Sequence, residues 1–198
     1  MKNALLIWRL IITKNQGLSF NFILGRLTRA KNEIFIDAST NFGCGGVYGR
    51  EYFMLGNERL SKGKFYGKYV MFGKVKIAYR ELLSAVLALI LFAPKFPSSF
   101  VRINCDNTNV VSWLNKGRCA KRLGYRLLSV IELIKLRFSL KVSVFYIKSS
   151  SNTSADLLSR GEIPLWLKTR GSRLSINMRK IDRILSNPVL FWKKALLV

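Results

Sequence analysis

The chain has 198 residues, with 34 lysines and arginines against only 10 aspartates and glutamates, so its formal net charge is +24. A hydrophobic fraction of 49% supports a packed core and argues against a disordered chain. The charge surplus predicts a polyanionic partner, with nucleic acid as the first expectation and an anionic membrane as the second. Histidine is absent, which excludes Ser-His-Asp triads, His-ligated zinc and imidazole general bases.

The cysteines and the apolar runs restrict where the protein works. Cys44, Cys105 and Cys119 are odd in number and lack CxxC spacing, so they predict free thiols and no zinc site. Free thiols indicate a reducing intracellular compartment, nuclear or cytoplasmic, and a protein that is not secreted. The longest apolar run, 82–93, falls short of the roughly twenty residues that span a bilayer, and residues 1–12 lack a signal-peptide cleavage pattern. The sequence therefore predicts no membrane partner.

The first half of the chain predicts short strands and then a buried helix. Residues 34–36 are an apolar run typical of a buried strand, and the glycine-rich segment 40–46 predicts the turn of a hairpin. Residues 52–55 and 64–72, rich in Phe, Tyr and Val, offer a third strand with uncertain limits. Residues 79–93 are good helix formers and apolar on nearly every side, which predicts a helix surrounded by the core.

The second half alternates strands with helices. Residues 100–105 predict a strand and 106–115 the helix after it. Residues 123–138 repeat apolar side chains on one helical face, and 142–147 predict the final strand. Asn152 then opens a last short helix. Antiparallel strands followed by helix-separated strands predict an α/β fold with a mixed sheet covered by helices.

Four of the ten acidic residues stand where strands end or helices begin, namely Asp37, Glu81, Asp106 and Asp156. If the strands before Asp37 and Asp106 are parallel neighbours, both side chains emerge at one edge of the sheet. Glu81 and Asp156 can then converge on them from the layer above. Such a cluster needs cations to stay ionised. Two Mg²⁺ ions, for which Mn²⁺ can substitute, would neutralise it and hold the reacting oxygens of a phosphodiester.

Each carboxylate also has an ordinary structural interpretation. Asp37 can form a turn, and Asp106 can cap the helix that follows it. Glu81 can favour a helix N-terminus through the dipole, and Asp156 can be a solvated helix residue behind an Asn152 cap. The four matching contexts together favour a single metal site over four separate explanations.

The segments around these carboxylates resemble the ribonuclease H domain of retroelement polymerases. They read Asp37-Ala38-Ser39 with glycines after it, Glu81-Leu82-Leu83, Asp106-Asn107-Thr108-x-Val110-Val111, and Asn152-x-x-Ala155-Asp156-x-Leu158-Ser159-Arg160. The likeness is to tyrosine-recombinase (DIRS-type) retrotransposons, and the hepadnaviral polymerase shows a similar plan. The last motif is the most specific. The resemblance covers about residues 31–166, which leaves a lead-in segment, 1–30, and a basic C-terminal extension, 167–198, with one expected helix over 178–185.

The resemblance implies a ribonuclease H-like fold, with a mixed five-stranded sheet flanked by helices. It also implies two-metal endonucleolytic hydrolysis of the RNA strand of RNA–DNA hybrids. By position, Asp37, Glu81, Asp106 and Asp156 take the catalytic and metal-ligand roles.

The chain departs from the family pattern in three ways. Tyr146-Ile147-Lys148-Ser149 stands where many relatives carry His-Ile-Pro-Gly, and Cys44 stands where Trp is frequent. The Tyr-x-Asp-Asp signature of the polymerase half is missing from the sequence. The first two departures leave hydrolysis possible. The missing signature indicates a part or remnant of a retroelement polymerase, or a domain put to separate use, with a reverse transcriptase domain as an expected partner.

Side chains that can bind the hybrid fall into two groups. One adjoins the proposed metals and can bond phosphates or 2′-hydroxyls, and the other is a basic loop between two helices. The first group is Ser39, Asn41, Asn107 and Thr108, and the second is Lys116, Arg118, Lys121 and Arg122. The first group can also be explained as ordinary turn or cap residues, and the second as charges that are simply solvated. Trp113 and Tyr125 flank the loop and are expected to pack there.

Other functions stay open. A catalytically inactive ribonuclease H-like module could bind nucleic acid or scaffold a complex; the missing polymerase favours it, whereas the intact carboxylates favour the enzyme. An integrase-type strand transferase needs a glutamate after Asp106, and Glu132 is too close and lies on an apolar-period helix. A DEDD exonuclease needs an acid where Ser39 stands.

Overall fold

The computed structural model describes residues 32–62 and 76–187. In chain order the elements are β1 (Asn32–Ala38), β2 (Gly43–Tyr48), β3 (Glu51–Gly56), α3 (Asn57–Ser61), α5 (Ile77–Phe92), η1 (Ala93–Lys95), β4 (Phe100–Cys105), α6 (Thr108–Lys116), α7 (Arg122–Phe138), β5 (Lys141–Tyr146), η2 (Ser149–Ser151), α8 (Thr153–Ser159), α9 (Leu165–Arg170), β6 (Ser172–Arg173) and α10 (Met178–Ser186).

The strands form one mixed sheet in the order β5-β4-β1-β2-β3-β6. Strand β1 lies in its middle, parallel to β4 and antiparallel to β2. Strands β4 and β5 are parallel, and β2 and β3 form an antiparallel hairpin. The predicted mixed sheet is confirmed, but it has six strands instead of five, because the two-residue strand β6 adds to β3 in parallel. A strand that short leaves no periodic pattern in the sequence.

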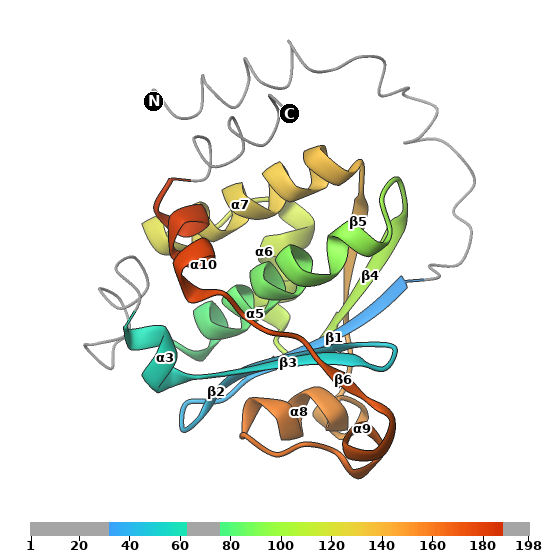
Figure 1. Cartoon of the computed structure of the whole chain (residues 1–198). Helices are drawn as coiled ribbons and strands as arrows, with labels where there is room; N and C mark the ends of the chain where they lie inside the picture. Colours follow the sequence, from blue (N-terminus) through green and yellow to red (C-terminus); the bar gives the residue numbers. More distant parts are fainter. Residues whose placement is uncertain (1–31, 63–75, 188–198) are drawn as a thin grey trace.

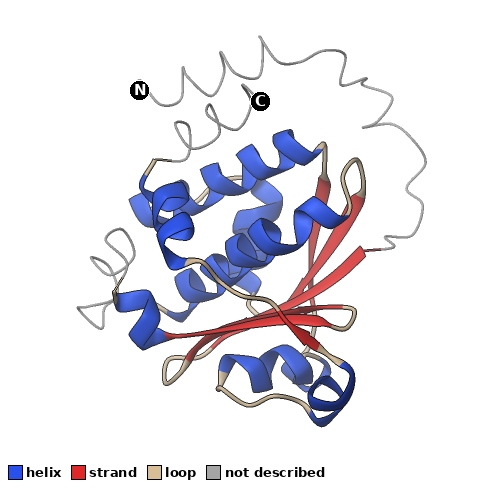
Figure 2. Ribbon diagram, viewed as in Figure 1, coloured by secondary structure: helices blue, strands red, loops and turns tan. Residues whose placement is uncertain are grey.

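Helices cover both faces of this sheet (Figures 1 and 2). Helices α5, α6, α7 and α10 lie on one face, and α8 and α9 lie on the other. Helix α5 forms the centre of the larger layer, as its uninterrupted apolar sequence predicted. Its side chains from Leu82 to Leu89 are all buried, and Pro94 in η1 follows its end.

Residues Ile77–Lys95 are long and apolar enough to cross a membrane by length and composition, with a mean hydropathy of 1.7. This differs from the sequence prediction that no apolar run is long enough, because the segment adds the first residues of α5 before the run and the end of η1 after it. Of that segment, 67% is buried inside the domain, where α5 packs between the sheet and α7. Its apolar character is therefore accounted for by the core.

The turn of the first hairpin is shorter than predicted. It consists of residues 39–42, and Ser39 organises it. The Ser39 N–H donates to the Gly43 carbonyl at 2.7 Å, and the Ser39 hydroxyl accepts from the N–H groups of Asn41 and Phe42 at 3.2 Å. The predicted turn glycines from residue 43 onward belong to strand β2 instead.

Two of these glycines are needed for close packing. A Cβ on Gly45 would lie 2.5 Å from the Leu158 Cβ on α8, and a Cβ on Gly46 would lie 2.6 Å from the Phe53 ring on β3. Non-bonded carbon atoms do not approach one another that closely, so any side chain at these positions would push α8 or Phe53 away. The glycines let helix and ring approach the backbone of β2, whereas the sequence suggested that they bend it.

The ends of the described chain differ from the predicted extensions. Residues 178–185 form the expected helix, now α10, which buries Ile181, Ile184 and Leu185 in the main core. Together with β6, this packs the described part of the basic extension onto the domain. The division at residues 30 and 166 stays a prediction. The lead-in segment 1–30 and the strand suggested over 64–72 lie outside the described residues.

Replacing Gly45 by alanine tests the close approach of α8. We expect Gly45→Ala to lower the free energy of unfolding by about 1–3 kcal/mol, because α8 must shift to accommodate the Cβ. Gly56→Ala is the matched control, since a Cβ there meets nothing closer than the Phe42 ring at 3.6 Å. Chemical denaturation of both variants measures the effect. Equal stability of the two would show that α8 does not lie where it is described.

Candidate active site

The four predicted carboxylates converge at one edge of the sheet. Asp37, near the end of β1, and Asp106, directly after β4, share that edge because the two strands are parallel neighbours, as predicted. Glu81 arrives from α5 and Asp156 from α8, which lie on opposite faces of the sheet (Figure 1). The prediction that both come from one layer is wrong. The cluster is closed from two sides.

Mutual repulsion links the members of this cluster. The charges of Asp106 and Asp156 raise the pKa of Asp37, and the charges of Asp106 and Asp37 raise the pKa of Glu81. Ligand atoms of Glu81, Cys105 and Asp106 lie within 4.8 Å of one another. The structure therefore assembles a negatively charged site at the sheet edge.

Glu81 is held inside the protein, 4% exposed. The Asn107 amide donates to its Oε1 at 3.0 Å. Burial raises the pKa of Glu81 to about 7, and the charges of Asp106 and Asp37 add to the rise. Glu81 lies beyond the first turn of α5, which contains no acidic residue, so a dipole role at the helix N-terminus does not explain it.

Asp37 is similarly enclosed, 6% exposed. The Ser159 hydroxyl donates to its Oδ2 at 2.5 Å. Burial raises the pKa of Asp37 to about 6; the charges of Asp106 and Asp156 add to this, and the hydrogen bond from Ser159 partly opposes it. A simple turn residue would be exposed, so the turn interpretation of Asp37 fails.

Cys105 is a site residue that sequence reasoning missed. Its thiol donates to the Glu81 Oε2 at 3.3 Å, across 24 positions in sequence. Burial, together with the neighbouring Glu81 charge, raises the pKa of Cys105 well above its usual range. The sulfur therefore stays protonated and donates to the carboxylate at neutral pH. Its place directly before Asp106 was the only available signal.

Ser149 is a second residue that was missed. It begins η2, and its hydroxyl donates to the Asp106 Oδ2 at 2.7 Å. The signal was present, because Ser149 closes the Tyr146-Ile147-Lys148-Ser149 segment, which departs from the His-Ile-Pro-Gly pattern of the domains that the sequence resembles. The serine that stands in place of the glycine of this pattern therefore supplies a hydroxyl that bonds the Asp106 carboxylate.

The Asn-x-x-Ala-Asp motif docks helix α8. Asn152 occupies the N-cap position, yet the described residues give its side chain no capping bond; its amide donates instead to the Ile36 carbonyl of β1 at 2.9 Å. At the other end of α8, the Arg160 guanidinium donates twice to the Asp156 Oδ1, at 2.8 and 2.9 Å. The bonds from Asn152 to Ile36 and from Ser159 to Asp37 fix α8 to β1, whereas the Arg160–Asp156 pair lies within α8 and its C-cap and orients the Asp156 carboxylate.

The four residues that were predicted to contact nucleic acid next to the metals differ in exposure and in hydrogen bonding. The Asn107 side-chain oxygen caps α6 by accepting from the N–H groups of Asn109 and Val110, so Asn107, and not Asp106, is the cap. Ser39 holds the hairpin turn. Asn41 and Thr108 are exposed. Contact of these four with nucleic acid stays a prediction.

The predicted basic loop lies at the other end of α6. Its four cationic side chains are all exposed, namely Lys116, Arg118, Lys121 and Arg122. Along α6, Lys116 lies about 12 Å from Thr108, because the helix rises about 1.5 Å per residue. Trp113, whose ring stacks on Tyr79 with centroids 5.1 Å apart, packs the base of the loop as expected.

The site has the donors that a hard divalent cation prefers. Carboxylate oxygens suit Mg²⁺ or Mn²⁺, whereas a protonated thiol does not. The raised pKa values of Asp37 and Glu81 show that burial and like charges disfavour their ionised forms. A bound cation would remove that penalty. Asp37, Glu81, Asp106 and Asp156 are the residues that could hold it.

These pKa shifts predict how stability depends on pH without metal. Because the folded pKa of Asp37 exceeds the usual value of 3.8, the folded state binds more protons, and stability falls as pH rises from about 4 to 7. Asp37→Asn removes this loss and should be more stable than the parent by about 3 kcal/mol at pH 7.5 in chelator, and no more stable at pH 4.

Denaturant titrations at both pH values measure the difference. Glu58→Gln is the control, because this exposed carboxylate, paired with Lys62, lies on α3. A parent and an Asp37→Asn variant with the same pH dependence would contradict a raised pKa at Asp37.

Comparison with known proteins supports the fold. No family model and no curated protein matches this sequence. The chain is similar to the solved RNase H1 of the halophilic archaeon Halobacterium salinarum NRC-1, with 15% identity and a TM-score of 0.47 over 64% of this chain and 92% of that one. It is also similar to LC11-RNase H1 in complex with an RNA/DNA hybrid, with 17% identity and a TM-score of 0.50 over 67% of this chain and 96% of that one. The second likeness, with the mixed sheet and its flanking helices, establishes the predicted ribonuclease H-like fold.

Proposed function

We propose that this protein is a ribonuclease H-type endonuclease that hydrolyses the RNA strand of RNA–DNA hybrids with the help of divalent metal ions. The observation that carries the proposal is the convergence of Asp37, Glu81, Asp106 and Asp156 at one edge of the sheet. The similar LC11-RNase H1 structure holds an RNA/DNA hybrid, which agrees with the proposed substrate.

The carboxylates would hold two Mg²⁺ ions, or Mn²⁺ in their place, which supply charge neutralisation at the phosphate and a more acidic bound water. The surrounding side chains set the orientation of the carboxylates in advance. Asn107 and Cys105 hold Glu81, Ser159 holds Asp37, and Ser149 holds Asp106. Partners of this kind fix ligand geometry, and their loss typically weakens metal sites about 10–100-fold.

Substrate binding would rest on two surfaces. The exposed basic loop at the end of α6 would contact phosphates, which position a duplex without reading its sequence. Asn41 and Thr108, which are both exposed, would contact the 2′-hydroxyls that distinguish RNA from DNA. The net charge of +24, from 34 basic against 10 acidic residues, would attract the polyanion from a distance.

The origin of the chain is a further part of the proposal. The sequence motifs support a part or remnant of a retroelement polymerase of the DIRS or hepadnaviral kind, with a reverse transcriptase domain as its natural partner. The three cysteines are free, which is consistent with an intracellular location, nuclear or cytoplasmic.

One observation favours a second candidate. The double hydrogen bond from Arg160 already neutralises Asp156, one of the proposed metal ligands. A module that binds nucleic acid without cleaving it could keep that ion pair permanently. In the enzyme, Asp156 would have to share its oxygens between Arg160 and a metal ion.

Replacing Asp106 separates the two candidates. Asp106→Asn removes a ligand charge, so cleavage of a labelled RNA–DNA hybrid in Mg²⁺ or Mn²⁺ should fall by at least about 100-fold. Binding of the hybrid and the melting temperature without metal should be retained, because the substitution keeps the shape of the side chain and reduces repulsion. Glu58→Gln should cleave like the parent.

Cleavage that survives Asp106→Asn would show that the carboxylate cluster is not the active site. A parent that binds the hybrid but does not cleave it in either metal would leave the inactive binding module as the function.

A further inference from the structure

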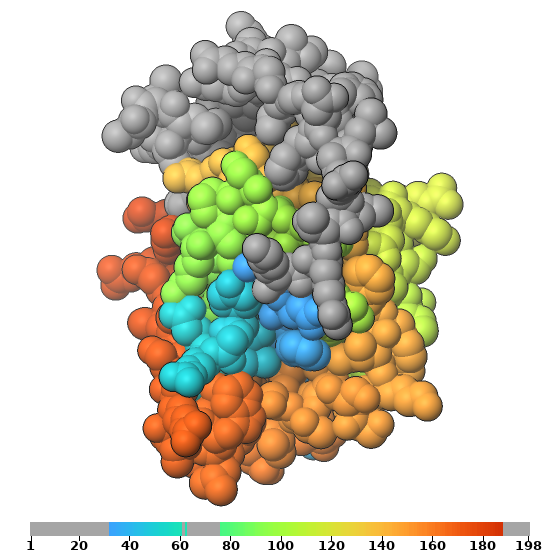
Figure 3. Space-filling view, turned by 90° about the vertical axis from the view of Figure 1, so that its right-hand side faces the viewer, coloured from blue at the N-terminus to red at the C-terminus, as the bar shows by residue number. Residues whose placement is uncertain are grey.

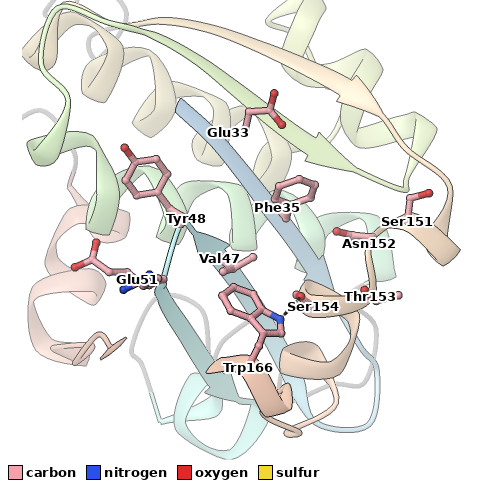
Figure 4. Close-up of a pocket in the computed structure, with 12 residues that line it drawn as sticks. Glu33, Phe35, Val47, Tyr48, Glu51, Ser151, Asn152, Thr153, Ser154 and Trp166 are labelled. Atoms are coloured by element: carbon pink, nitrogen blue, oxygen red, sulfur yellow. Dashed lines mark hydrogen bonds between the residues drawn. The ribbon is translucent and has the colours of Figure 1, made fainter. Parts of the chain in front are cut away.

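A pocket of about 640 Å³ opens on the α8 face of the sheet, beside the carboxylate edge (Figure 4). Glu33 and Phe35 of β1, Tyr48 at the end of β2, Asn152 before α8 and Trp166 of α9 line it. Seen from this side, the start of β1 in blue, the β2–β3 hairpin in cyan and the α8–α9 segment in orange meet at the surface (Figure 3). The proposed reaction uses none of these five side chains.

Two aromatic rings give the pocket flat apolar walls. Figure 4 shows Phe35 and Trp166 on different sides of the cavity. The indole N–H of Trp166 donates to the Ser154 hydroxyl at 3.2 Å, which orients a ring that is 44% exposed. Exposed, oriented aromatic rings are the groups on which unpaired bases stack in single-strand-binding proteins.

An unsatisfied polar atom lies in the same wall. Asn152 is 1% exposed, and its amide nitrogen is used by the Ile36 carbonyl. Its Oδ1 has no hydrogen-bond partner among the residues that the structure describes. Nearly all buried polar atoms in proteins are bonded, so an acceptor without a protein partner at a pocket wall is available to a donor from a water molecule or from a ligand that displaces it.

The surface beside the pocket continues the same chemistry. By register, Phe35, Asn104 and Phe145 form one row across β1, β4 and β5, so all three lie on the α8 face. Phe145 is exposed, and the Arg102 guanidinium lies 4.3 Å from its ring centroid. An aromatic ring with a cation over it suits a nucleic-acid strand, which offers both bases and phosphates.

We propose that this pocket binds an unpaired nucleobase that carries an exocyclic amino group, adenine being the best example. The ring would stack against Trp166 and Phe35, and the amino group would donate to the Asn152 Oδ1. Arg50, exposed and part of the pocket lining, would meet the phosphate of that nucleotide. The volume is of the size of pockets for single small ligands.

The position of the pocket suggests how the base arrives. Phe35 lies two residues before Asp37 on β1, about 7 Å along the strand. A single-stranded tail that leaves a hybrid at the carboxylate edge would reach the pocket within a few nucleotides. This route for the tail rests on the proposed function, whereas binding of a free single strand does not.

Fluorescence anisotropy with labelled probes tests the proposal in two ways. The full chain is titrated with a free pentamer of deoxyadenosine, and with hybrids that are blunt or carry a five-nucleotide adenine tail. We expect the tail to increase affinity by about 10-fold over the blunt hybrid. Trp166→Leu should abolish that gain and weaken the free pentamer, whereas Tyr125→Leu, which removes an exposed ring on α7, should retain both.

The base itself tests the role of Asn152 without altering the protein. Tails of purine, which lacks the amino group, and of thymine should lose most of the gain. Equal affinity for tailed and blunt hybrids, a gain that survives Trp166→Leu, or equal binding of adenine and purine would overturn the proposal. If the adenine tail has no effect, but peptides that carry an aromatic side chain bind and Trp166→Leu weakens their binding, the pocket would be assigned to a protein partner instead.

The result is independent of catalysis. Trp166→Leu should cleave a blunt hybrid at the rate of the parent. If the parent cleaves nothing, the proposed function fails, and binding of the adenine pentamer still decides the role of the pocket.

Discussion

The close approach of helix α8 to strands β1 and β2 is the contact on which the rest of the site depends. Gly45 leaves room for Leu158 by having no side chain, and Asn152 ties the start of the helix to the Ile36 carbonyl. The Ser159 hydroxyl then donates to Asp37, so one short helix positions a site carboxylate from its own face of the sheet. Because Asp156 belongs to the same helix, a displaced α8 would open the cluster and the neighbouring pocket together.

Buried like charges explain why these supports are needed. Asp37 and Glu81 lose hydration and repel their neighbours, so each is stabilised by hydrogen bonds from Ser159, Asn107 or Cys105. The remaining repulsion favours a cation. The surplus of basic residues works in the same direction, because it attracts a polyanion to a site whose negative charge metal ions would neutralise.

Some of this could be predicted from the sequence and some could not. Asp37 and Asp106 could be brought together, because parallel strands end at a common edge and their apolar runs are evident. Gly45 was misread, since a glycine that permits a turn and one that permits close packing look alike in a sequence. The contacts of Cys105 with Glu81 and of Ser149 with Asp106 span 24 and 43 positions, and no local pattern records them. The approach of Glu81 and Asp156 from opposite faces of the sheet could not be predicted either, because the sequence does not show which face each helix covers.

The central claim, that buried and mutually repelling carboxylates form one metal site, is tested most directly by counting protons released when metal binds. With pKa values of about 6 for Asp37 and about 7 for Glu81, the two groups together hold about one proton at pH 6.5, which a cation must displace. Calorimetric titration of Mn²⁺ in buffers of different ionisation enthalpy measures this number. The account predicts release of about one proton at pH 6.5 and close to none at pH 8.5, and metal binding without proton release at pH 6.5 would contradict it.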